Sequence, residues 1–576
     1  MDYIYMLKQL WGYSGEDKKK VVIFMIFHFI SILGQLGKPL AFAMILNTLQ
    51  KNTSTLIQDV VFWLSIYLIC FFIFEIFHRA GRYIERFVAF RARKNFINSI
   101  YKHLRFLPLN WHNDNHSGSI IDRVNKASNA LYYFGEMQFV YVQVFVQLIF
   151  PLVVLSFISP VVSVATLLSG LFLVFVTKKL YNLSVPEYRY QNDLFHKVAE
   201  GLHDYISNIN TIITLRLGEP TQSDINNRIK KVYPHIKKEN NITQLKCFIS
   251  ALIIVLLDIG LIFFYIYSQN AAQQIVMIGS VTLIFLYLHQ TMDSFSFYSG
   301  DYEYLIHWKT DFEAVELILD EEPEDHLQNP EKLGPWKKLE LKNISFSYDG
   351  KNKSVDNVSV SIHKGSKIAF VGESGSGKST FLKLIRGITP IKSGYLCIDD
   401  SKNKNINSLS KVTTLIPQEP EIFENTILYN ITMGLDYKTD DLYKSIQISC
   451  FDYVLKKLPE GLDTDIREKG VNLSGGEKQR LALTRGIYSI KDSEIVLLDE
   501  PTSNVDPFIE KKIFNNLFNE HENISMISVL HRLHLVKNFD YIYVFKNGSI
   551  VEEGEFADLI TNKGEFSRLW QQYSSK

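Results

Sequence analysis

The sequence contains little that would suit a disulfide-rich or zinc-binding protein. It has four cysteines in 576 residues, and they are not spaced like disulfide or metal ligands: Cys70, Cys247, Cys397 and Cys450. We interpret them as ordinary apolar residues. Residues 1–20 are polar and have no small-residue cleavage site, so we expect no signal peptide. The formal net charge is zero, which gives no reason to expect nucleic acid as a partner.

Charged residues are scarce over long stretches of the first half. A bilayer-spanning helix needs about 20 apolar residues. Six stretches come close to this length: Val21–Ile45, Leu56–Phe77, Phe134–Ser159, Val161–Tyr181, Phe248–Tyr267 and Ile275–Met292. We predict that each crosses a membrane.

The basic residues of this half gather in two long segments, 79–126 and 178–246. The turns at 159–161 and 268–274 have no Lys or Arg, and Gln50–Thr55 has only Lys51. Because positively charged loops stay on the cytoplasmic side, we predict that both long segments, the N-terminus and the C-terminal half are cytoplasmic.

Both long segments favour helices that continue beyond the bilayer, over Tyr83–Leu107 and Tyr188–Leu217. The breaks near Trp111–Gly118 and Asn208–Gly218 indicate either a short helix that reaches the soluble half or a solvated loop. Met1–Trp11 is mixed in polarity and indicates either an interfacial helix or a frayed terminus.

Some ionisable residues fall inside or near the spans: His28, Glu75, Asp258, His289 and Asp293. Charge in hydrocarbon is costly and usually faces a cavity or a partner. Asp258 lies in the middle of its stretch, too far from either end to reach the interface. Two interpretations stay open for it: either a substrate or coupling contact, or a structural cause, which is a helix–helix hydrogen bond or a wrongly placed span boundary.

The second half contains a glycine-rich stretch, VGESGSGKST, at Val371–Thr380. It fits the pattern G-x-x-x-x-G-K-[ST], after a predicted strand at Lys367–Val371 and before a predicted helix at Ser379–Arg386. Backbone amides at such a helix start cradle phosphate. We predict a nucleotide-binding loop made of Gly372, Glu373, Ser374, Gly375, Ser376, Gly377, Lys378, Ser379 and Thr380. Lys378 is expected to reach the β- and γ-phosphates, and the Ser379 hydroxyl to bind Mg²⁺.

Two acidic residues follow another apolar strand, Glu494–Leu498. A carboxylate at a strand end beside a phosphate loop can hold Mg²⁺ through water, and a second one can orient and deprotonate the attacking water. We assign the first role to Asp499 and the second to Glu500. Gln418 follows the run Val412–Pro417 and is predicted to be an uncharged ligand for metal or water.

Two further residues are candidates by position. His531 ends the predicted strand Ile524–Leu530, at the edge where phosphates bind in parallel sheets; a lone histidine there is also commonly structural. Tyr348 ends the predicted strand Leu339–Tyr348, 24 residues before Gly372, where an aromatic ring either stacks on a base or packs in the core.

The stretch NLSGGEKQR at Asn472–Arg480 resembles the signature sequence of the ATP-binding-cassette (ABC) transporters. The order of the other motifs is also similar to that family. The resemblance implies that Tyr348 stacks on adenine, Gln418 forms the glutamine loop, Asp506 belongs to the inter-cassette loop and His531 is the switch histidine. It also implies that the signature acts in trans on a second cassette, through Leu473, Ser474, Gly475, Gly476 and Glu477.

Six spans ahead of one cassette resemble the exporter-type half-transporters. Thr464–Gly470, TDIREKG, is similar to the T-E-V-G-E-R-G loop of exporters, in which Glu468 matches the coupling acid. Arg467 and Lys469 depart from that pattern. Departures elsewhere, such as Glu477 in place of the commoner glutamine, remove no catalytic group.

The implied fold class is an all-α six-helix transmembrane domain followed by an α/β P-loop NTPase domain, the ABC cassette. We expect an interfacial segment at 1–20, the transmembrane domain at 21–318, a linker at 319–338 and the cassette at 339–576. The linker rests on Asp320–Lys337, which is rich in Glu, Asp and Pro.

The resemblance implies ATP and Mg²⁺ as cofactors. Ser379, Gln418 and Asp499 are then the Mg²⁺ ligands, and Glu500, His531 and Gln418 the catalytic set. One chain holds half of the family's usual set of spans and cassettes, so a homodimer is the simplest completion, with a heterodimer as the alternative.

The implied function is ATP-driven export or flipping of a lipid, drug-like molecule or peptide by alternating access. The bias toward Lys, Asn, Ile and Tyr suggests a bacterium, and hence the cell (inner) membrane. An ATP-gated regulatory or channel protein is the alternative, and a damaged Glu500 or signature would favour it. A processing exporter would need a protease domain ahead of the spans, for which residues 1–20 are too short. Six spans contradict a soluble ATP-binding factor.

Overall fold

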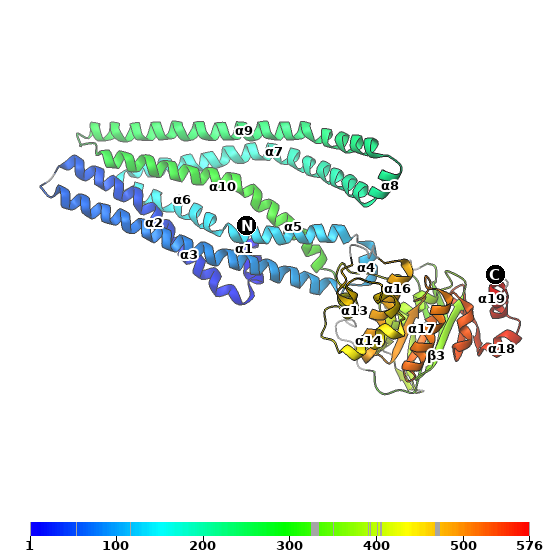
Figure 1. The fold of residues 1–576 in the computed structure, drawn as a ribbon. Helices are drawn as coiled ribbons and strands as arrows, with labels where there is room; N and C mark the ends of the chain where they lie inside the picture. Colours follow the sequence, from blue (N-terminus) through cyan, green and yellow to red (C-terminus); the bar gives the residue numbers. More distant parts are fainter. Residues whose placement is uncertain are drawn as a thin grey trace. The chain divides into compact units, whose positions relative to one another are not determined.

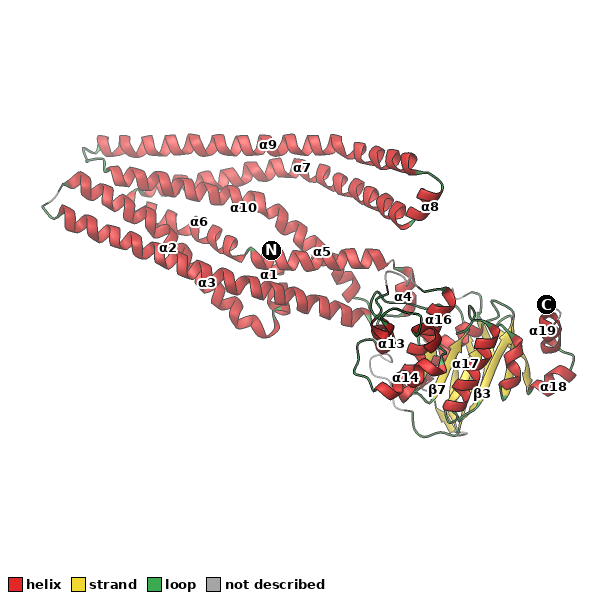
Figure 2. Cartoon of the chain, viewed as in Figure 1, coloured by secondary structure: helices red, strands yellow, loops and turns green. Residues whose placement is uncertain are grey.

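The computed structural model describes residues 2–52, 54–115, 117–323, 333–348, 351–389, 391, 393–399, 401–403, 406–466 and 473–574. Contacts between residues divide the chain into two compact units. The first comprises Met1–Lys102 and Gly118–Asp320, and the second His103–Ser117 and Glu321–Lys576. The first unit is helical and the second contains both helices and strands (Figures 1 and 2), as the predicted fold class requires.

The first unit consists of helices, most of them long (Figure 1): α1 Asp2–Tyr13, α2 Lys18–Lys51, α3 Leu56–Leu104, α5 Ser117–Glu136, α6 Gln138–Ile158, α7 Pro160–Ser207, α8 Ile209–Thr214, α9 Gly218–Ala271 and α10 Ile278–Leu319. At 54 residues and about 1.5 Å per residue, α9 is about 81 Å long. The hydrocarbon core of a bilayer is about 30 Å thick, so this helix must continue well outside it. The sequence predicts such continuations for Tyr83–Leu107 and Tyr188–Leu217, but not for α9.

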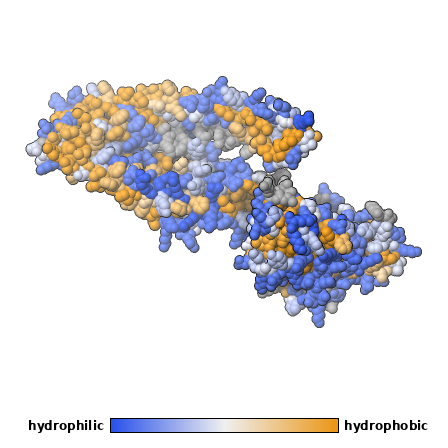
Figure 3. Space-filling view, in the orientation of Figure 1, coloured by the Kyte–Doolittle hydropathy of each residue, from blue (hydrophilic) through white to orange (hydrophobic). Residues whose placement is uncertain are grey.

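Five helical segments of the described chain are long and apolar enough to span a membrane. They lie within α2, α3, α6, α7 and α9. The sixth predicted span falls in α10, which packs against α2, α6, α7 and α9. It is less apolar than the other five because α10 begins only at Ile278 and soon includes His289, Gln290 and Asp293. Apolar side chains gather on the visible face of this unit (Figure 3).

The N-terminal helix α1 is docked against the bundle, and is not a frayed end. Met6 and Leu10 are fully buried. The Tyr3 hydroxyl donates to the Gln138 side chain at 2.9 Å, and the Lys309 ammonium lies 2.9 Å from the Asp2 carboxylate. The helix therefore connects the starts of α2 and α6 to the end of α10.

Polar contacts account for two of the ionisable residues near the spans, one of them between helices and the other within one helix. His28 on α2 lies 3.2 Å from the Glu85 carboxylate on α3, and both side chains are fully buried. Glu85 also accepts hydrogen bonds from the Arg82 guanidinium at 2.7 Å and the Phe139 amide at 3.0 Å. Glu75 pairs with Arg79 one turn away at 2.8 Å.

The backbones of α2 and α10 approach each other closely at Gly279. A Cβ atom placed there would lie 1.9 Å from the Ala43 carbonyl oxygen and 2.5 Å from the Asn47 side chain. Only glycine leaves room for two helix backbones at this separation, which is how small residues serve membrane helix packing.

We expect Gly279→Ala to destabilise the membrane unit. The added methyl group must push α2 and α10 apart, and overpacking of this kind costs about 1–3 kcal/mol. Thermal unfolding of the purified protein in detergent measures the effect. Gly260→Ala on α9 is the matched control, because a Cβ at Gly260 meets nothing within 4 Å. Equal unfolding temperatures for the two variants would contradict the packing argument.

Two sheets form the framework of the second unit (Figure 2). The six-stranded sheet has the order β10-β9-β3-β8-β7-β6, and all its strands are parallel except β10. Its strands are β3 Lys367–Gly372, β6 Thr413–Ile416, β7 Ile495–Asp499, β8 Ser525–Val529, β9 Tyr541–Lys546 and β10 Ser549–Gly554. Every residue of β7 and β8 is buried, which is typical of central parallel strands and explains the apolar run Ile495–Leu498 of β7.

The second sheet is antiparallel and has the order β2-β1-β4-β5. Its strands are β1 Lys338–Phe346, β2 Val355–His363, β4 Ser393–Ile398 and β5 Ser401–Asn403. The helices of this unit include α12 Lys378–Arg386, α13 Ile427–Thr432, α14 Thr439–Ile448, α15 Asp452–Leu455, α16 Gly475–Tyr488, α17 Pro507–Glu520, α18 Phe556–Thr561 and α19 Glu565–Ser574.

Both predicted breaks in the cytoplasmic segments contain short helices. At the first, α4 (Leu109–Asp114) starts directly after Pro108 and groups with the second unit. At the second, α7 ends at Ser207 because Asn208 leaves the helical conformation, and α8 follows within the first unit. The first break is therefore a helix associated with the α/β unit.

Candidate functional site

The predicted site residues of the second unit lie at one edge of the six-stranded sheet. Gly372 ends β3, Asp499 ends β7, Gln418 follows β6 and His531 follows β8. These four strands are parallel, so their carboxyl ends meet at the same edge. Ligands of open α/β sheets bind at this edge.

The glycine-rich loop joins β3 to α12. Gly377 has φ of 100°, and a Cβ there would lie 2.5 Å from the Ser354 carbonyl oxygen, so glycine is required on both counts. The Lys378 ammonium donates to the carbonyls of Gly372 and Glu373, each at 2.8 Å. Burial lowers the pKa of Lys378, which is only 6% exposed. A phosphate group in the loop would supply the negative charge that this buried ammonium lacks.

Ser379 and Asp499 form a pair of oxygen ligands. The Ser379 hydroxyl donates to the Asp499 carboxylate at 2.7 Å. Asp499 is 5% exposed, and burial raises its pKa despite the hydrogen bond from Ser379, which lowers it. Hydroxyl and carboxylate oxygens are the ligands that Mg²⁺ prefers in proteins. Their contact, next to the phosphate-binding loop, fits the predicted Mg²⁺ site.

Glu500 stands beside this pair, directly after β7. Its backbone is left-handed, with φ of 47°, which is uncommon for a residue with a side chain. Its carboxylate accepts a hydrogen bond from the Gln418 amide at 2.9 Å. Glu500 is the predicted base, and Gln418 the predicted uncharged ligand for metal or water. The structure brings their side chains into contact.

His531 and Glu500 line the same cavity, of about 240 Å³. The next residue, Arg532, holds the wall of the cavity through the Val505 carbonyl at 2.7 Å and the Glu510 carboxylate at 3.2 Å. Glu510 is buried and also accepts from the Thr502 hydroxyl at 2.6 Å. Neither Lys378 nor Ser379 lines this cavity, so it lies beside Glu500 and not within the glycine-rich loop.

The signature residues begin α16. Ser474 is the N-cap, and the Glu477 carboxylate accepts from its amide at 2.9 Å, which completes a capping box. This hydrogen bond lowers the pKa of Glu477. Ser474 and Gly475 are exposed, whereas Leu473 packs in the core beside α13. Between residues 473–477 and 372–380, all of them described, we find no hydrogen bond, so the signature does not complete the loop of its own chain.

Gln479 connects this helix to the sheet edge that contains Glu500, although the sequence does not predict a role for it. Its side chain donates to the Ser503 hydroxyl at 2.8 Å and accepts from the Asn504 amide at 2.7 Å. It also lies 3.4 Å from the Glu500 carbonyl oxygen. It belongs to the quoted signature stretch, so its position in that motif is the signal that points to it.

Of the three remaining predicted residues, two lie within the described part of the chain. Tyr348 is 52% exposed, and its hydroxyl lies 3.5 Å from that of Thr380, so its ring is available beside the loop. Asp506 is the N-cap of α17 and accepts from the Phe508 amide at 2.8 Å. Glu468 lies outside the described residues, as do Arg467 and Lys469.

Arg568 is a further residue that the sequence pattern does not reveal. From α19 it reaches Glu373 of the glycine-rich loop, with 2.7 Å between guanidinium and carboxylate. It also pairs with Glu565 one turn away. The C-terminal helix thus holds one side of the loop.

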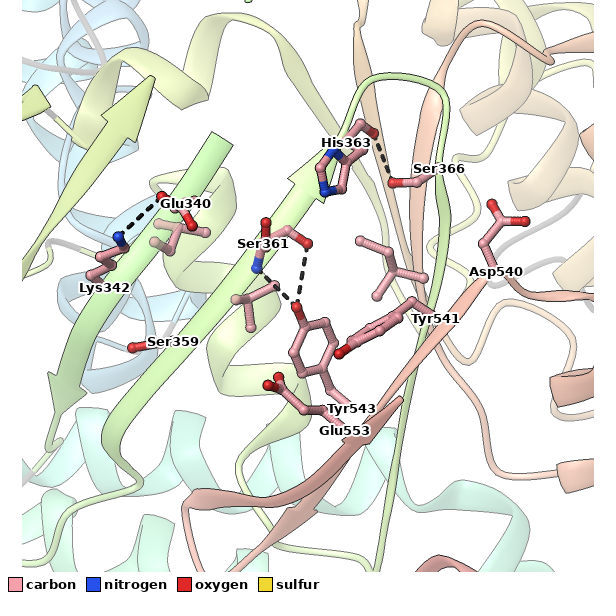
Figure 4. Close-up of a pocket in the computed structure, with 13 residues that line it drawn as sticks. Glu340, Lys342, Ser359, Ser361, His363, Ser366, Asp540, Tyr541, Tyr543 and Glu553 are labelled. Atoms are coloured by element: carbon pink, nitrogen blue, oxygen red, sulfur yellow. Dashed lines mark hydrogen bonds and ion pairs between the residues drawn. The ribbon is translucent and has the colours of Figure 1, made fainter. Parts of the chain in front are cut away.

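A larger cavity, of about 540 Å³, lies away from these residues (Figure 4). Strands β1, β2, β3, β9 and β10 line it, and the Tyr543 hydroxyl accepts from the Ser361 amide there at 2.9 Å. It reaches the amino-terminal part of β3 at Ile368, whereas the glycine-rich loop follows the carboxyl end. No predicted site residue lines it.

Comparison with known proteins gives matches in both units. The family model described as "ABC transporter transmembrane region" matches residues 21–295, and the one described as "ABC transporter" matches residues 355–503. "ABC transporter B family member 6" of Dictyostelium discoideum is 26% identical over 98% of this chain and 86% of its own length.

Other relatives match over smaller shares. "Iron-sulfur clusters transporter atm1, mitochondrial" of Aspergillus fumigatus is 30% identical over 53% of this chain and 43% of its own length. "Heavy metal tolerance factor 1" of Caenorhabditis elegans is 28% identical over 82% and 59%. Among solved structures, a bacterial Atm1-family ABC exporter with ATP bound has a TM-score of 0.82 at 22% identity, covering 97% of this chain and 100% of the other. This last similarity concerns the fold.

Proposed function

Because this chain belongs to the ABC transporter family, as an exporter-type half-transporter with a membrane region and one ATPase cassette, we propose that it works as a dimer that exports or flips its substrate by alternating access. The observation that carries this proposal is the convergence of Lys378, Ser379, Asp499 and Glu500 at one sheet edge. The cassette retains every group that hydrolysis requires, which favours transport over an ATP-gated channel.

The chemistry follows from the positions of these side chains. The loop amides and the Lys378 ammonium are suited to hold the β- and γ-phosphates, and the exposed ring of Tyr348 to stack on the base. Glu500 is placed to accept a proton from the attacking water, while Gln418, 2.9 Å away, orients its carboxylate. His531, in the same cavity, is positioned to contact the γ-phosphate side.

We propose Mg²⁺ as the metal, held by the Ser379 hydroxyl, by Gln418 and, through water, by Asp499. When bound, it supplies positive charge that neutralises phosphate oxygens during transfer. The protein's own part is to keep Asp499 buried and aligned through the 2.7 Å hydrogen bond from Ser379.

The exposed signature supports a dimer. Ser474 and Gly475, at the start of α16, are exposed. Neither forms a hydrogen bond to residues 372–380 of its own chain. A helix N-terminus is suited to bind phosphate, so we propose that each signature closes the ATP site of a second copy.

Mixed dimers test this arrangement. We expect a dimer of a Lys378→Ala chain and a Ser474→Arg chain, both carrying Glu500→Gln, to retain one ATP after washing, because one loop and the opposite signature stay intact. Each variant paired with itself is expected to retain none. Retained labelled ATP per differently tagged dimer is the measurement.

The control has the same two substitutions on a single chain, paired with a Glu500→Gln chain. Sites formed in trans are then both damaged and should retain no ATP, whereas sites formed in cis would leave one intact. One retained ATP in this control, together with none in the mixed dimer, would contradict the trans arrangement.

We further propose that α4 couples the cassette to the membrane region. It groups with the cassette unit, yet it is joined directly to α3 and α5. Movement of the cassette on ATP binding would therefore pull on both helices. We propose that Glu468, in the loop that precedes the signature, is the acidic residue that takes part in this coupling.

The protein is an integral membrane protein, and we propose the bacterial cell membrane with both termini in the cytoplasm. The substrate we propose is a lipid, a drug-like molecule or a peptide. The names of two relatives refer to iron-sulfur clusters and to heavy metal. We do not extend these substrates to this chain, because the matches cover only 43% and 59% of the relatives' own lengths. Stimulation of ATP hydrolysis by a panel of these compounds, and by glutathione conjugates, tests the choice.

A further inference from the structure

A cluster of three ionisable side chains joins α9 to α10 inside the membrane region. The His289 ring lies 3.5 Å from the Asp258 carboxylate on one side and 3.6 Å from the Asp293 carboxylate on the other. Asp258 is 7% exposed, and its second oxygen, Oδ1, is buried without a hydrogen-bond partner. A buried carboxylate oxygen with no donor is costly, so this oxygen is available for a ligand.

The cluster lies near the middle of the bilayer. Asp258 is 13 residues before the end of α9 at Ala271, and His289 is 11 residues after the start of α10 at Ile278. At 1.5 Å per residue, these positions are about 20 and 17 Å from the outer ends of their helices. Half of a hydrocarbon core is about 15 Å, so neither side chain can reach the interface.

Two members of the cluster are open on the surface of the single chain. The side chains of His289 and Asp293 are 53% and 61% exposed. A charged group at this depth does not face lipid; it faces a partner or a water-filled cavity. In a dimeric exporter, that cavity is the substrate pathway.

The charge of this region is one-sided. Between Cys247 and Trp308 the sequence contains no Lys or Arg, whereas it contains Asp258 within one predicted span and Asp293 directly after the next, Ile275–Met292. Lys38, the basic residue within the apolar run of α2, lies over the Phe74 ring on α3 at 4.8 Å. The cluster therefore attracts cations and repels anions.

The surroundings favour an organic cation over a bare metal ion. Within the described residues, no group of three or more His, Cys, Asp or Glu side chains has the arrangement of a metal site. The His289 ring is stacked with Phe285, which is itself exposed. An aromatic ring beside carboxylates suits a molecule with an apolar body and a positive charge.

We propose that Asp258, His289 and Asp293 form a substrate site for amphipathic organic cations. The proposal rests on the proposed export function and narrows it: the cargo is the cationic subset of drug-like molecules. Asp258 supplies the buried charge and Asp293 the exposed one, and His289 lies between the two carboxylates.

Tetraphenylphosphonium and tetraphenylborate test the charge preference, because they have the same shape and opposite charges. We expect the phosphonium to stimulate ATP hydrolysis by the full-length protein in liposomes, and the borate not to stimulate it at equal concentration. Equal stimulation by both ions would overturn the proposal, as would stimulation by Zn²⁺ alone.

Binding of labelled phosphonium to the nucleotide-free protein tests the residues. We expect Asp258→Asn and Asp293→Asn each to weaken binding at least about tenfold, because each removes one charged contact. Asp59→Asn, at the outer start of α3, is the matched control and should leave affinity unchanged. Unchanged affinity in both cluster variants would overturn the site.

The experiments distinguish a failure of the proposed export function from a failure of the proposed cation site. A wild-type protein without ATP hydrolysis would contradict the export function, yet phosphonium binding without nucleotide would still report on the cluster. Normal hydrolysis without phosphonium binding would contradict only the cluster. Thermal unfolding of each variant confirms that it is folded before affinity is compared.

Discussion

Glu500→Gln is expected to abolish ATP hydrolysis while ATP stays bound. In the wild-type protein, the hydrogen bond from Gln418 to Glu500 is 2.9 Å long. Glutamine at position 500 keeps the size of the side chain and an oxygen that can accept this bond, but it cannot take a proton. Loss of a general base lowers the rate by about 10²–10⁴-fold. Phosphate release in proteoliposomes measures hydrolysis, and retention of labelled ATP after washing measures binding.

Glu494→Gln is the matched control, because Glu494 precedes the same strand that Glu500 follows. Its carboxylate forms a surface ion pair with Lys364 at 3.1 Å, and pairs of this kind contribute about 0–1 kcal/mol to stability. Hydrolysis should stay at the wild-type rate in this variant. Wild-type turnover in Glu500→Gln would exclude Glu500 as the base and direct attention to His531, which lines the same cavity.

The nucleotide site could be predicted from the sequence because its residues follow strands directly. The motif fixes Lys378 and Ser379 at a helix start, and Asp499 ends an apolar run that can only be a buried strand. Parallel strands place both carboxyl ends at the same edge of the sheet. The 2.7 Å contact between Ser379 and Asp499 also depends on the strand order, in which only β8 separates β3 from β7.

Contacts made by side chains from distant segments could not be predicted. Arg568 reaches Glu373 across 195 residues. Glu373 belongs to the glycine-rich motif, but nothing in the sequence around Arg568 marks it as the partner of that loop. Strand order of the antiparallel sheet is also unmarked, because short alternating strands such as β5 fit many partners. A pattern along the chain carries no information about which of these alternatives forms.

The membrane region shows the same division. Hydropathy predicted six spans, and five described helices are long and apolar enough to cross a membrane, since every residue of a lipid-facing stretch contributes to the signal. It also singled out Asp258 but left its surroundings open. The pairing with His289 depends on how α9 and α10 are rotated and staggered, and apolar helices offer many staggers of similar hydropathy.

Lys378→Ala is expected to weaken ATP binding about 10–100-fold and to stop transport-linked hydrolysis. A hydrogen bond to a charged group contributes about 1.5–3 kcal/mol, and 1.4 kcal/mol corresponds to a tenfold change in affinity. Here the ammonium is already desolvated, as its lowered pKa indicates, so phosphate gains a charge partner that water does not compete for. Equilibrium binding of a fluorescent ATP analogue measures the affinity.

A second variant separates charge from packing. Lys378 also donates to the loop carbonyls of Gly372 and Glu373, so alanine removes both the charge and the loop's internal support. Lys378→Met keeps the buried stem; if charge dominates, it should bind ATP as weakly as Lys378→Ala while unfolding at a higher temperature. Lys364→Ala, on an exposed pair of the same cassette, should keep full affinity. Unchanged affinity in the methionine variant would mean that the loop amides alone hold the phosphates.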